Sequence, residues 1–159
     1  MAKNPIIPEV PKESKPQITL KYAKEVAETG KTCTENYKEM DIAPAYRWTF
    51  SEITNVRNFL PRAADPNNPR KEHVMKKCEG WSLSLFITQK QAEDRLRFYL
   101  DDKPNLNLVF GTHVAEGNIE KKDGLNGEPN NKGHFEHLEY DGIDLAKKFK
   151  IISQVYKPI

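Results

Sequence analysis

The sequence contains few cysteines and glycines, and both shortages exclude classes of protein. Only Cys33 and Cys78 are present among 159 residues, without Cys-x-x-Cys spacing, which argues against a thiolate zinc site and a disulfide framework. Two such thiols indicate a reducing, cytoplasmic setting. The eight glycines form neither G-x-G-x-x-G nor G-x-x-x-x-G-K-[ST], so the usual dinucleotide and P-loop nucleotide sites are disfavoured.

Long apolar runs and an excess of one charge are also missing. No segment reaches the roughly 20 apolar residues that cross a bilayer, and prolines interrupt the N-terminus where a signal core would lie. We therefore expect no membrane association and no export by the general secretory route. Lys and Arg total 25 against 23 Asp and Glu, a net charge of +2, so no global field favours nucleic acid.

The chain begins with a proline-rich segment and continues with enough sequence for one folded domain. Residues 1–17 carry Pro5, Pro8 and Pro11 at a spacing of three, which aligns them along one edge of a polyproline II helix. We expect a flexible, solvated tail here, with the three prolines as candidate partner-binding residues. Residues 18–159 are expected to form a single domain.

Helical and strand periodicities divide that domain into two parts. Apolar residues at helical spacing predict a hairpin of two helices over residues 18–41. A sheet-containing core over residues 45–159 begins with an alternating strand at 46–50, and further strands are expected at 106–114 and 149–156. The predicted fold class is α+β, with the helical hairpin followed by a mixed or antiparallel sheet and short helices packed on it.

The strongest local signal is a strand followed by a helix over residues 81–100. Between Trp81 and Ile87 the odd positions are apolar, while Ser82 and Ser84 occupy the opposite face. A capping pattern then opens an amphipathic helix. We expect the apolar face of the strand to pack beneath this helix, which leaves both serines on the other face.

The segment 117–133 is rich in glycine and asparagine. A loop of this length inside a compact domain is usually functional or disordered, and it could act as a lid. His113 precedes it and His134 and His137 follow, so these histidines would approach one another if the flanking strands paired. The period of two in a strand places His134 and His137 on opposite faces, and we predict no metal site.

Several polar residues form a candidate catalytic group: Arg47, Ser82, Ser84, Glu136 and Glu139. An arginine and a serine-bearing strand can bind a phosphorylated nucleotide, and a carboxylate can stabilise an oxocarbenium-like centre. In outline the group resembles ADP-ribosyltransferase-type domains, over residues 46–140 and without a diagnostic motif. The resemblance implies NAD as the cofactor and leaves open which glutamate is catalytic. The alternative is that Arg47 pairs with a surface carboxylate and the serines face solvent.

Basic side chains gather around the loop at residues 61–77. The candidate phosphate-binding residues among them are Arg62, Arg70, Lys76 and Lys77. They could contact a phosphate backbone or an acidic protein, and acidic neighbours dilute them. The alternative is a solvated loop.

These features lead to three functional hypotheses. The first is a cytoplasmic accessory or interaction module that needs no cofactor and binds a protein partner through the proline tail or the helical hairpin. The second is a small NAD-consuming enzyme of the ADP-ribosyltransferase type. Nucleic-acid binding through the basic loop ranks third. The partner and the oligomeric state are not specified by any motif.

Overall fold

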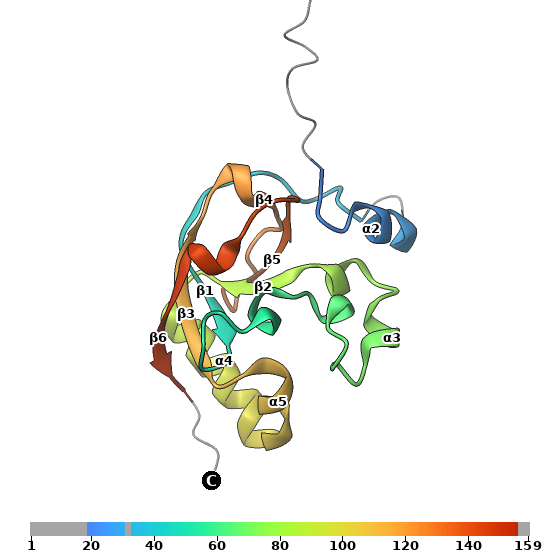
Figure 1. Cartoon of the computed structure of the whole chain (residues 1–159). Helices are drawn as coiled ribbons and strands as arrows, with labels where there is room; N and C mark the ends of the chain where they lie inside the picture. The colour runs from blue at the N-terminus through green and yellow to red at the C-terminus, as the bar shows by residue number, and fades with distance from the viewer. Residues whose placement is uncertain (1–18, 31–32, 156–159) are drawn as a thin grey trace, which may run out of the picture.

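A six-stranded antiparallel sheet forms the centre of the computed structural model, which describes residues 19–30 and 33–155. Its strand order is β4-β5-β2-β1-β3-β6, and every neighbouring pair is antiparallel (Figure 1). The strands are β1 (Ile42–Thr49), β2 (Leu83–Phe86), β3 (His113–Ile119), β4 (Gly124–Asn126), β5 (His134–Glu139) and β6 (Phe149–Gln154). The antiparallel sheet with short helices packed on it confirms the α+β class.

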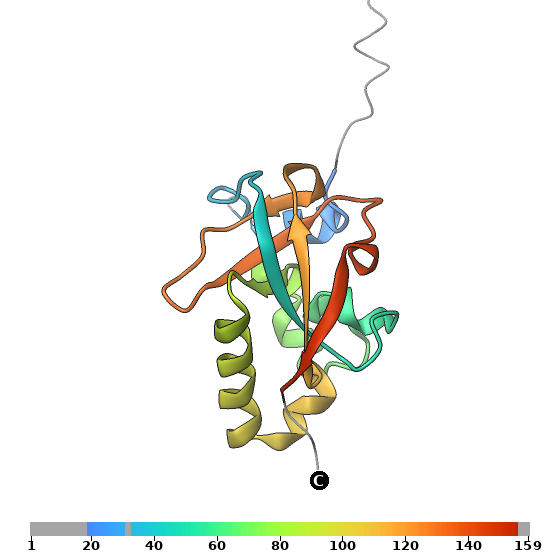
Figure 2. The same cartoon turned by 90° about the vertical axis from the view of Figure 1, so that its left-hand side faces the viewer.

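One long helix and several short ones accompany the sheet. The α-helices are α2 (Ala23–Thr29), α3 (Lys71–Val74), α4 (Gln89–Asp102) and α5 (Asn107–Phe110). The 3-10 turns are η1 (Val56–Phe59), η2 (Arg62–Ala64), η3 (Cys78–Trp81), η4 (Pro104–Leu106), η5 (Lys121–Asp123) and η6 (Leu145–Lys147). As its capping pattern predicts, α4 begins after Thr88, whose hydroxyl accepts a hydrogen bond from the backbone N–H of Gln91 at 3.1 Å. Figure 2 shows α4 standing beside the strands.

The two faces of the sheet bury different side chains. One face packs Leu83, Leu85 and Phe135 with residues from η1 and η6. The other packs Tyr46 and Phe86 against α4. The prediction that the odd residues of β2 lie beneath α4 is therefore wrong, because those residues are already buried on the opposite face.

Three predicted strands are present, including the one at 81–87, which is β2, and a fourth is wrong. The strands predicted at 46–50 and 149–156 correspond to β1 and β6. The segment 106–114 instead contains η4 and α5, and β3 starts only at His113. The reason is local: Pro104 favours a helical turn, and Gly111 ends it with a φ of 79°. A Cβ at Gly111 would lie 2.1 Å from the Thr49 carbonyl oxygen, so only glycine fits.

The segment 117–133 is more structured than its composition indicates. β3 continues to Ile119, η5 and β4 follow, and the loop proper spans only 127–133. β3 and β5 are separated by β1 and β2, so the expected approach of His113 to the later histidines is wrong.

The predicted helical hairpin at 18–41 is represented by one described helix. α2 covers Ala23–Thr29, residues 33–36 form turns, and Lys38 bridges to Asn126. Because residues 31–32 lie outside the described chain, the hairpin as a whole stays a prediction. The division at residue 18 does too, since the tail with Pro5, Pro8 and Pro11 also lies outside the described residues.

Cys33 and Cys78 form a disulfide, with their Cα atoms 5.7 Å apart. The prediction of two unbridged thiols is therefore wrong, because a separation of 45 residues along the chain says nothing of their distance in the fold. Disulfides persist mainly in oxidising compartments. This pair is at odds with the cytoplasmic location, which itself stays a prediction. Within the described residues, no helix is both long enough and apolar enough to cross a membrane.

Candidate functional site

A cavity of about 600 Å³ opens on the face of the sheet that carries α4. Its floor comes from β1, β2 and β5, one wall from α4 and α5, and the opposite wall from the segment between η1 and η3. The loop 127–133 contributes to its rim. The volume falls within the range of pockets that hold small-molecule ligands.

Four of the five candidate catalytic residues line this one cavity: Arg47, Ser82, Ser84 and Glu136. Antiparallel pairing explains how two of them meet, because Ser84 lies directly opposite Glu136 in the β2–β5 register. Directly opposite residues share a face of the sheet. The serines therefore face a cavity, rather than open solvent as in the alternative reading.

Glu136 is the acidic group that the sheet contributes to the cavity, which Asp65 and Glu79 also line. Its carboxylate accepts a hydrogen bond from the Ser82 hydroxyl and lies 3.3 Å from His134 Nε2. Burial raises the pKa of Glu136 to about 7, while the hydrogen bond from Ser82 opposes this shift. A carboxyl group with a pKa near neutrality can serve as an acid or a base at physiological pH.

The guanidinium of Arg47 is held at the cavity wall by backbone groups. Its Nε donates to the carbonyl of Asn58 at 2.7 Å, and its NH1 donates to the carbonyl of Ser84 at 2.8 Å. Burial lowers its pKa to about 10, while Glu139 and Glu136 act against this shift. Arg47 therefore stays charged at neutral pH and places a fixed positive charge beside Glu136.

Ser84 and His134 form a second polar pair on the floor. The hydroxyl of Ser84 lies 2.9 Å from Nε2 of His134. Burial lowers the pKa of His134, and the positive charges of Arg95 and Arg47 lower it further. A neutral imidazole can accept a hydrogen bond, so this pair can orient a polar group of a ligand.

Glu139, the fifth candidate, does not line the cavity. It belongs to the opposite face of β5, where its carboxylate lies 3.5 Å from Lys21 Nζ. Burial raises its pKa, and Lys21 counteracts the shift. Of the two glutamates that the sequence left open, Glu136 lines the cavity and Glu139 does not.

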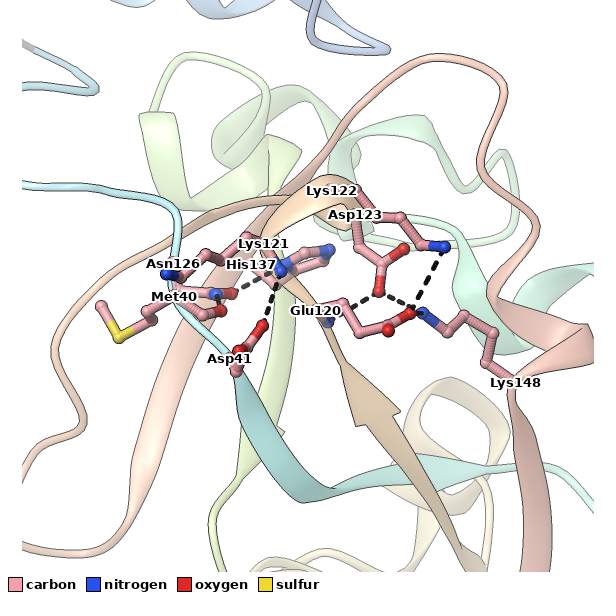
Figure 3. Close-up of polar contacts among 9 residues, drawn as sticks. All are labelled: Met40, Asp41, Glu120, Lys121, Lys122, Asp123, Asn126, His137 and Lys148. Atoms are coloured by element: carbon pink, nitrogen blue, oxygen red, sulfur yellow. Dashed lines mark hydrogen bonds and ion pairs between the residues drawn. The ribbon is translucent and has the colours of Figure 1, made fainter.

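His137 also faces away from the cavity, into a buried polar cluster at the other side of the sheet. Its Nδ1 lies 2.7 Å from Oδ1 of Asn126, whose amide donates to the Met40 carbonyl (Figure 3). In the same view Lys148 reaches Asp123 and Glu120. Burial lowers the pKa of His137 to about 4, so it is neutral. These contacts fix β4 and η5 to the sheet.

An aromatic wall, unforeseen as a site feature, closes the end of the cavity next to α4 and α5. Trp48 is its centre, with ring centroids 5.4 Å from Phe86, 5.9 Å from Tyr99 and 5.0 Å from Phe110. The Trp48 indole donates to the carbonyl of Ala92 at 2.8 Å, which fixes the ring. Such a surface suits a flat ring. The spacing of apolar residues along α4, which includes Tyr99, predicts only that one face of this helix is buried. No local pattern in the sequence predicts the aromatic wall.

The opposite wall is basic. Three of the candidate phosphate-binding residues, Arg62, Arg70 and Lys77, line the cavity, whereas Lys76 does not. Arg57 also lines it but is paired with Asp65 at 3.0 Å. The cavity therefore combines a carboxyl group, an aromatic end and a cationic end.

The described residues contain no group of three or more His, Cys, Asp or Glu side chains that could hold a metal ion. Compared with known proteins, the chain matches no family model, no curated protein and no solved structure.

Proposed function

We propose that the cavity binds NAD and that the protein cleaves the bond between nicotinamide and ribose, as a transferase or glycohydrolase of the ADP-ribosyltransferase type. The observation that carries this proposal is the convergence of Arg47, Ser84 and Glu136, from three strands, at one cavity. Two further features support it: the aromatic wall suits the flat nicotinamide or adenine ring, and the basic wall suits phosphate.

In the proposed reaction the bond from ribose C1′ to the nicotinamide nitrogen breaks, and its electron pair leaves with nicotinamide. Positive charge then develops on the ribose, and the carboxylate of Glu136 stabilises it. Water or another hydroxyl forms the new bond to C1′, and its proton passes to the carboxylate. Ser82, which donates to Glu136, keeps that group in position.

Ionisation of Glu136 sets the pH dependence of this reaction. Its pKa of about 7 lies well above the ordinary value of 4.5, so the active carboxylate form accumulates as pH rises through 7. Arg47 and Arg62 favour the carboxylate, and both line the cavity. Turnover should therefore be faster at pH 8 than at pH 6.

Partner binding through Pro5, Pro8 and Pro11 stays a hypothesis, because these residues lie outside the described chain. Nucleic-acid binding through the basic loop stays one as well. Neither accounts for a carboxyl group buried beside two serines at the floor of a cavity, which is why NAD cleavage ranks first.

The test is release of nicotinamide from NAD, followed by chromatography at pH 8. The full chain should release nicotinamide, and Glu136→Gln should reduce the rate by about 100-fold or more, since a charge-stabilising group is lost. Glu139→Gln is the matched control, three residues away on the other face, and should retain most of the activity. No turnover by the full chain, or equal losses in the two variants, would overturn the proposal.

A further inference from the structure

The basic wall of the cavity contains cations that have no acidic partner. Arg62, Arg70 and Lys77 line it and are exposed. Within the described residues none of the three forms an ion pair, in contrast to Arg57, which is neutralised by Asp65. Three unpaired cations on one wall, against the single carboxylate of Glu79, make a local positive field despite a net charge of only +2.

A buried asparagine holds two of these cations at a fixed spacing. Asn68 is only 5% exposed, and its side-chain amide donates to the carbonyl of Arg62 at 3.0 Å. Its Oδ1 accepts a hydrogen bond from the backbone N–H of Arg70, also at 3.0 Å. The backbone of both arginines is thereby anchored, which lowers the cost of ordering the loop that carries them to the cavity.

Lys77 is brought to the same wall by a close approach of two backbone segments. A Cβ at Gly80 would lie 2.0 Å from the carbonyl oxygen of Val74, so only glycine lets α3 pack onto η3. Lys77 lies in the chain between α3 and η3 and lines the cavity. The positive charge of this wall also affects His73. Lys77 and Arg70 lower the pKa of His73, and every charged group that acts on it is positive.

The number of unpaired cations distinguishes between two kinds of phosphate. Each phosphate of a dinucleotide pyrophosphate carries one negative charge, whereas a phosphate monoester carries about −1.5 to −2 at pH 7. A pyrophosphate spreads its two charges over two phosphorus centres, whereas the monoester concentrates nearly the same charge on one, so three cations on one wall complement the monoester better. We infer that Arg62, Arg70 and Lys77 form a subsite for a phosphate monoester, so that the cavity prefers NADP to NAD; this rests on the proposed function for the identity of the nucleotide.

Binding of the two nucleotides to the Glu136→Gln variant, measured by calorimetry in phosphate-free buffer, tests the inference without consuming the ligand. NADP should bind about tenfold more tightly than NAD, the effect of one additional set of charge-assisted hydrogen bonds. Adding Lys77→Gln should weaken NADP binding more than NAD binding and so bring the two affinities together. Lys76→Gln is the matched control, because it removes the same charge one residue away and does not line the cavity.

Each outcome distinguishes this inference from the proposed function. Equal affinities for NADP and NAD, in a protein that cleaves NAD, would overturn the subsite alone. Binding of adenosine 2′-monophosphate that is lost in Lys77→Gln, without turnover of NAD, would support the subsite and overturn the proposed function. If Lys76→Gln weakened NADP binding as much as Lys77→Gln, or if both reduced salt-sensitive binding of RNA or DNA equally, the positive field would be diffuse and the subsite wrong.

Discussion

Glu136 and His137 are neighbours on β5, yet they belong to opposite sides of the sheet and to different kinds of environment. Glu136 faces a cavity with Ser82 and charged side chains around it, while His137 is fully buried against Asn126. Burial favours the neutral form of each, raising the pKa of Glu136 to about 7 and lowering that of His137 to about 4.

The contrast between Glu136 and His137 shows under which condition a shifted pKa indicates a functional site. The polar groups around His137 hydrogen-bond to other groups of the same chain, and these contacts connect β4 and η5 to the rest of the sheet (Figure 3). The role of this cluster is therefore structural. Burial also shifts the pKa of Glu136, but this side chain lines a cavity of about 600 Å³. A perturbed carboxyl group becomes a candidate for catalysis only together with such a cavity.

Among the substitutions considered, Glu136→Gln should give the largest effect, because it should change activity and stability in opposite directions. Activity should fall by about 100-fold or more, whereas stability should rise at pH 8. The sign follows from the raised pKa: the unfolded state loses its proton near pH 4.5 and the folded state only near pH 7, so stability falls between these pH values and the full loss is present at pH 8. Thermal unfolding at pH 8 and the nicotinamide assay measure the two effects, and a lower melting temperature would contradict this account.

Changing His137 should give the reverse pattern. His137→Leu leaves the buried oxygen of Asn126 without its donor, at a cost of about 1–3 kcal/mol in the free energy of unfolding. The protein that remains folded should retain its activity. Urea unfolding measures the loss, and His73→Leu, at an exposed position, is the control that should change little. A His137→Leu variant that is stable but inactive would contradict the separation of the two sides.

The titration of His137 should appear in the pH dependence of stability. Its pKa is lower in the folded state, about 4 against an ordinary 6.5, so the unfolded state takes up the proton first and folding is weakened as pH falls from about 6.5 to 4. Glu136 acts in the opposite direction over pH 7 to 4.5. We therefore expect the difference in unfolding free energy between the wild type and His137→Gln to shrink with acidification. A difference independent of pH would contradict this expectation.

The smallest effect is expected from Ser82→Ala. The Ser82 hydroxyl donates to the Glu136 carboxylate and so lowers its pKa, and removing it should move the rise in activity to higher pH. Rates of nicotinamide release from pH 5.5 to 9 measure the shift. Ser84→Ala, which removes the partner of His134 instead, should leave the midpoint closer to that of the wild type.

Local chemistry in the sequence predicted several elements correctly. The clearest example is the cap at Thr88, which starts α4. Such interactions span three or four residues and are therefore visible in sequence. The strand at 106–114 failed because apolar alternation over a few residues does not distinguish a strand from a short helix between Pro104 and Gly111.

Contacts between residues far apart in the sequence were harder to predict. The group of Arg47, Ser84 and Glu136 was proposed from residue types, but the sheet order that unites them came only from the fold. The aromatic wall around Trp48 and the pairing of Cys33 with Cys78 had no local signal at all. Residue chemistry thus indicated the candidates, and the fold shows which of them line one cavity: Glu136 does and Glu139 does not.

The central claim, that the cavity side of the sheet is the nucleotide site, is tested most directly by nuclear magnetic resonance. Saturating NAD is added to the Glu136→Gln variant labelled with ¹⁵N, and shifts of the backbone amides are recorded. We predict changes at Ser84, Lys132 and their cavity neighbours, and none at Asn126 and Asp123 on the far side. No shift in the cavity, or shifts confined to the far cluster, would contradict the claim.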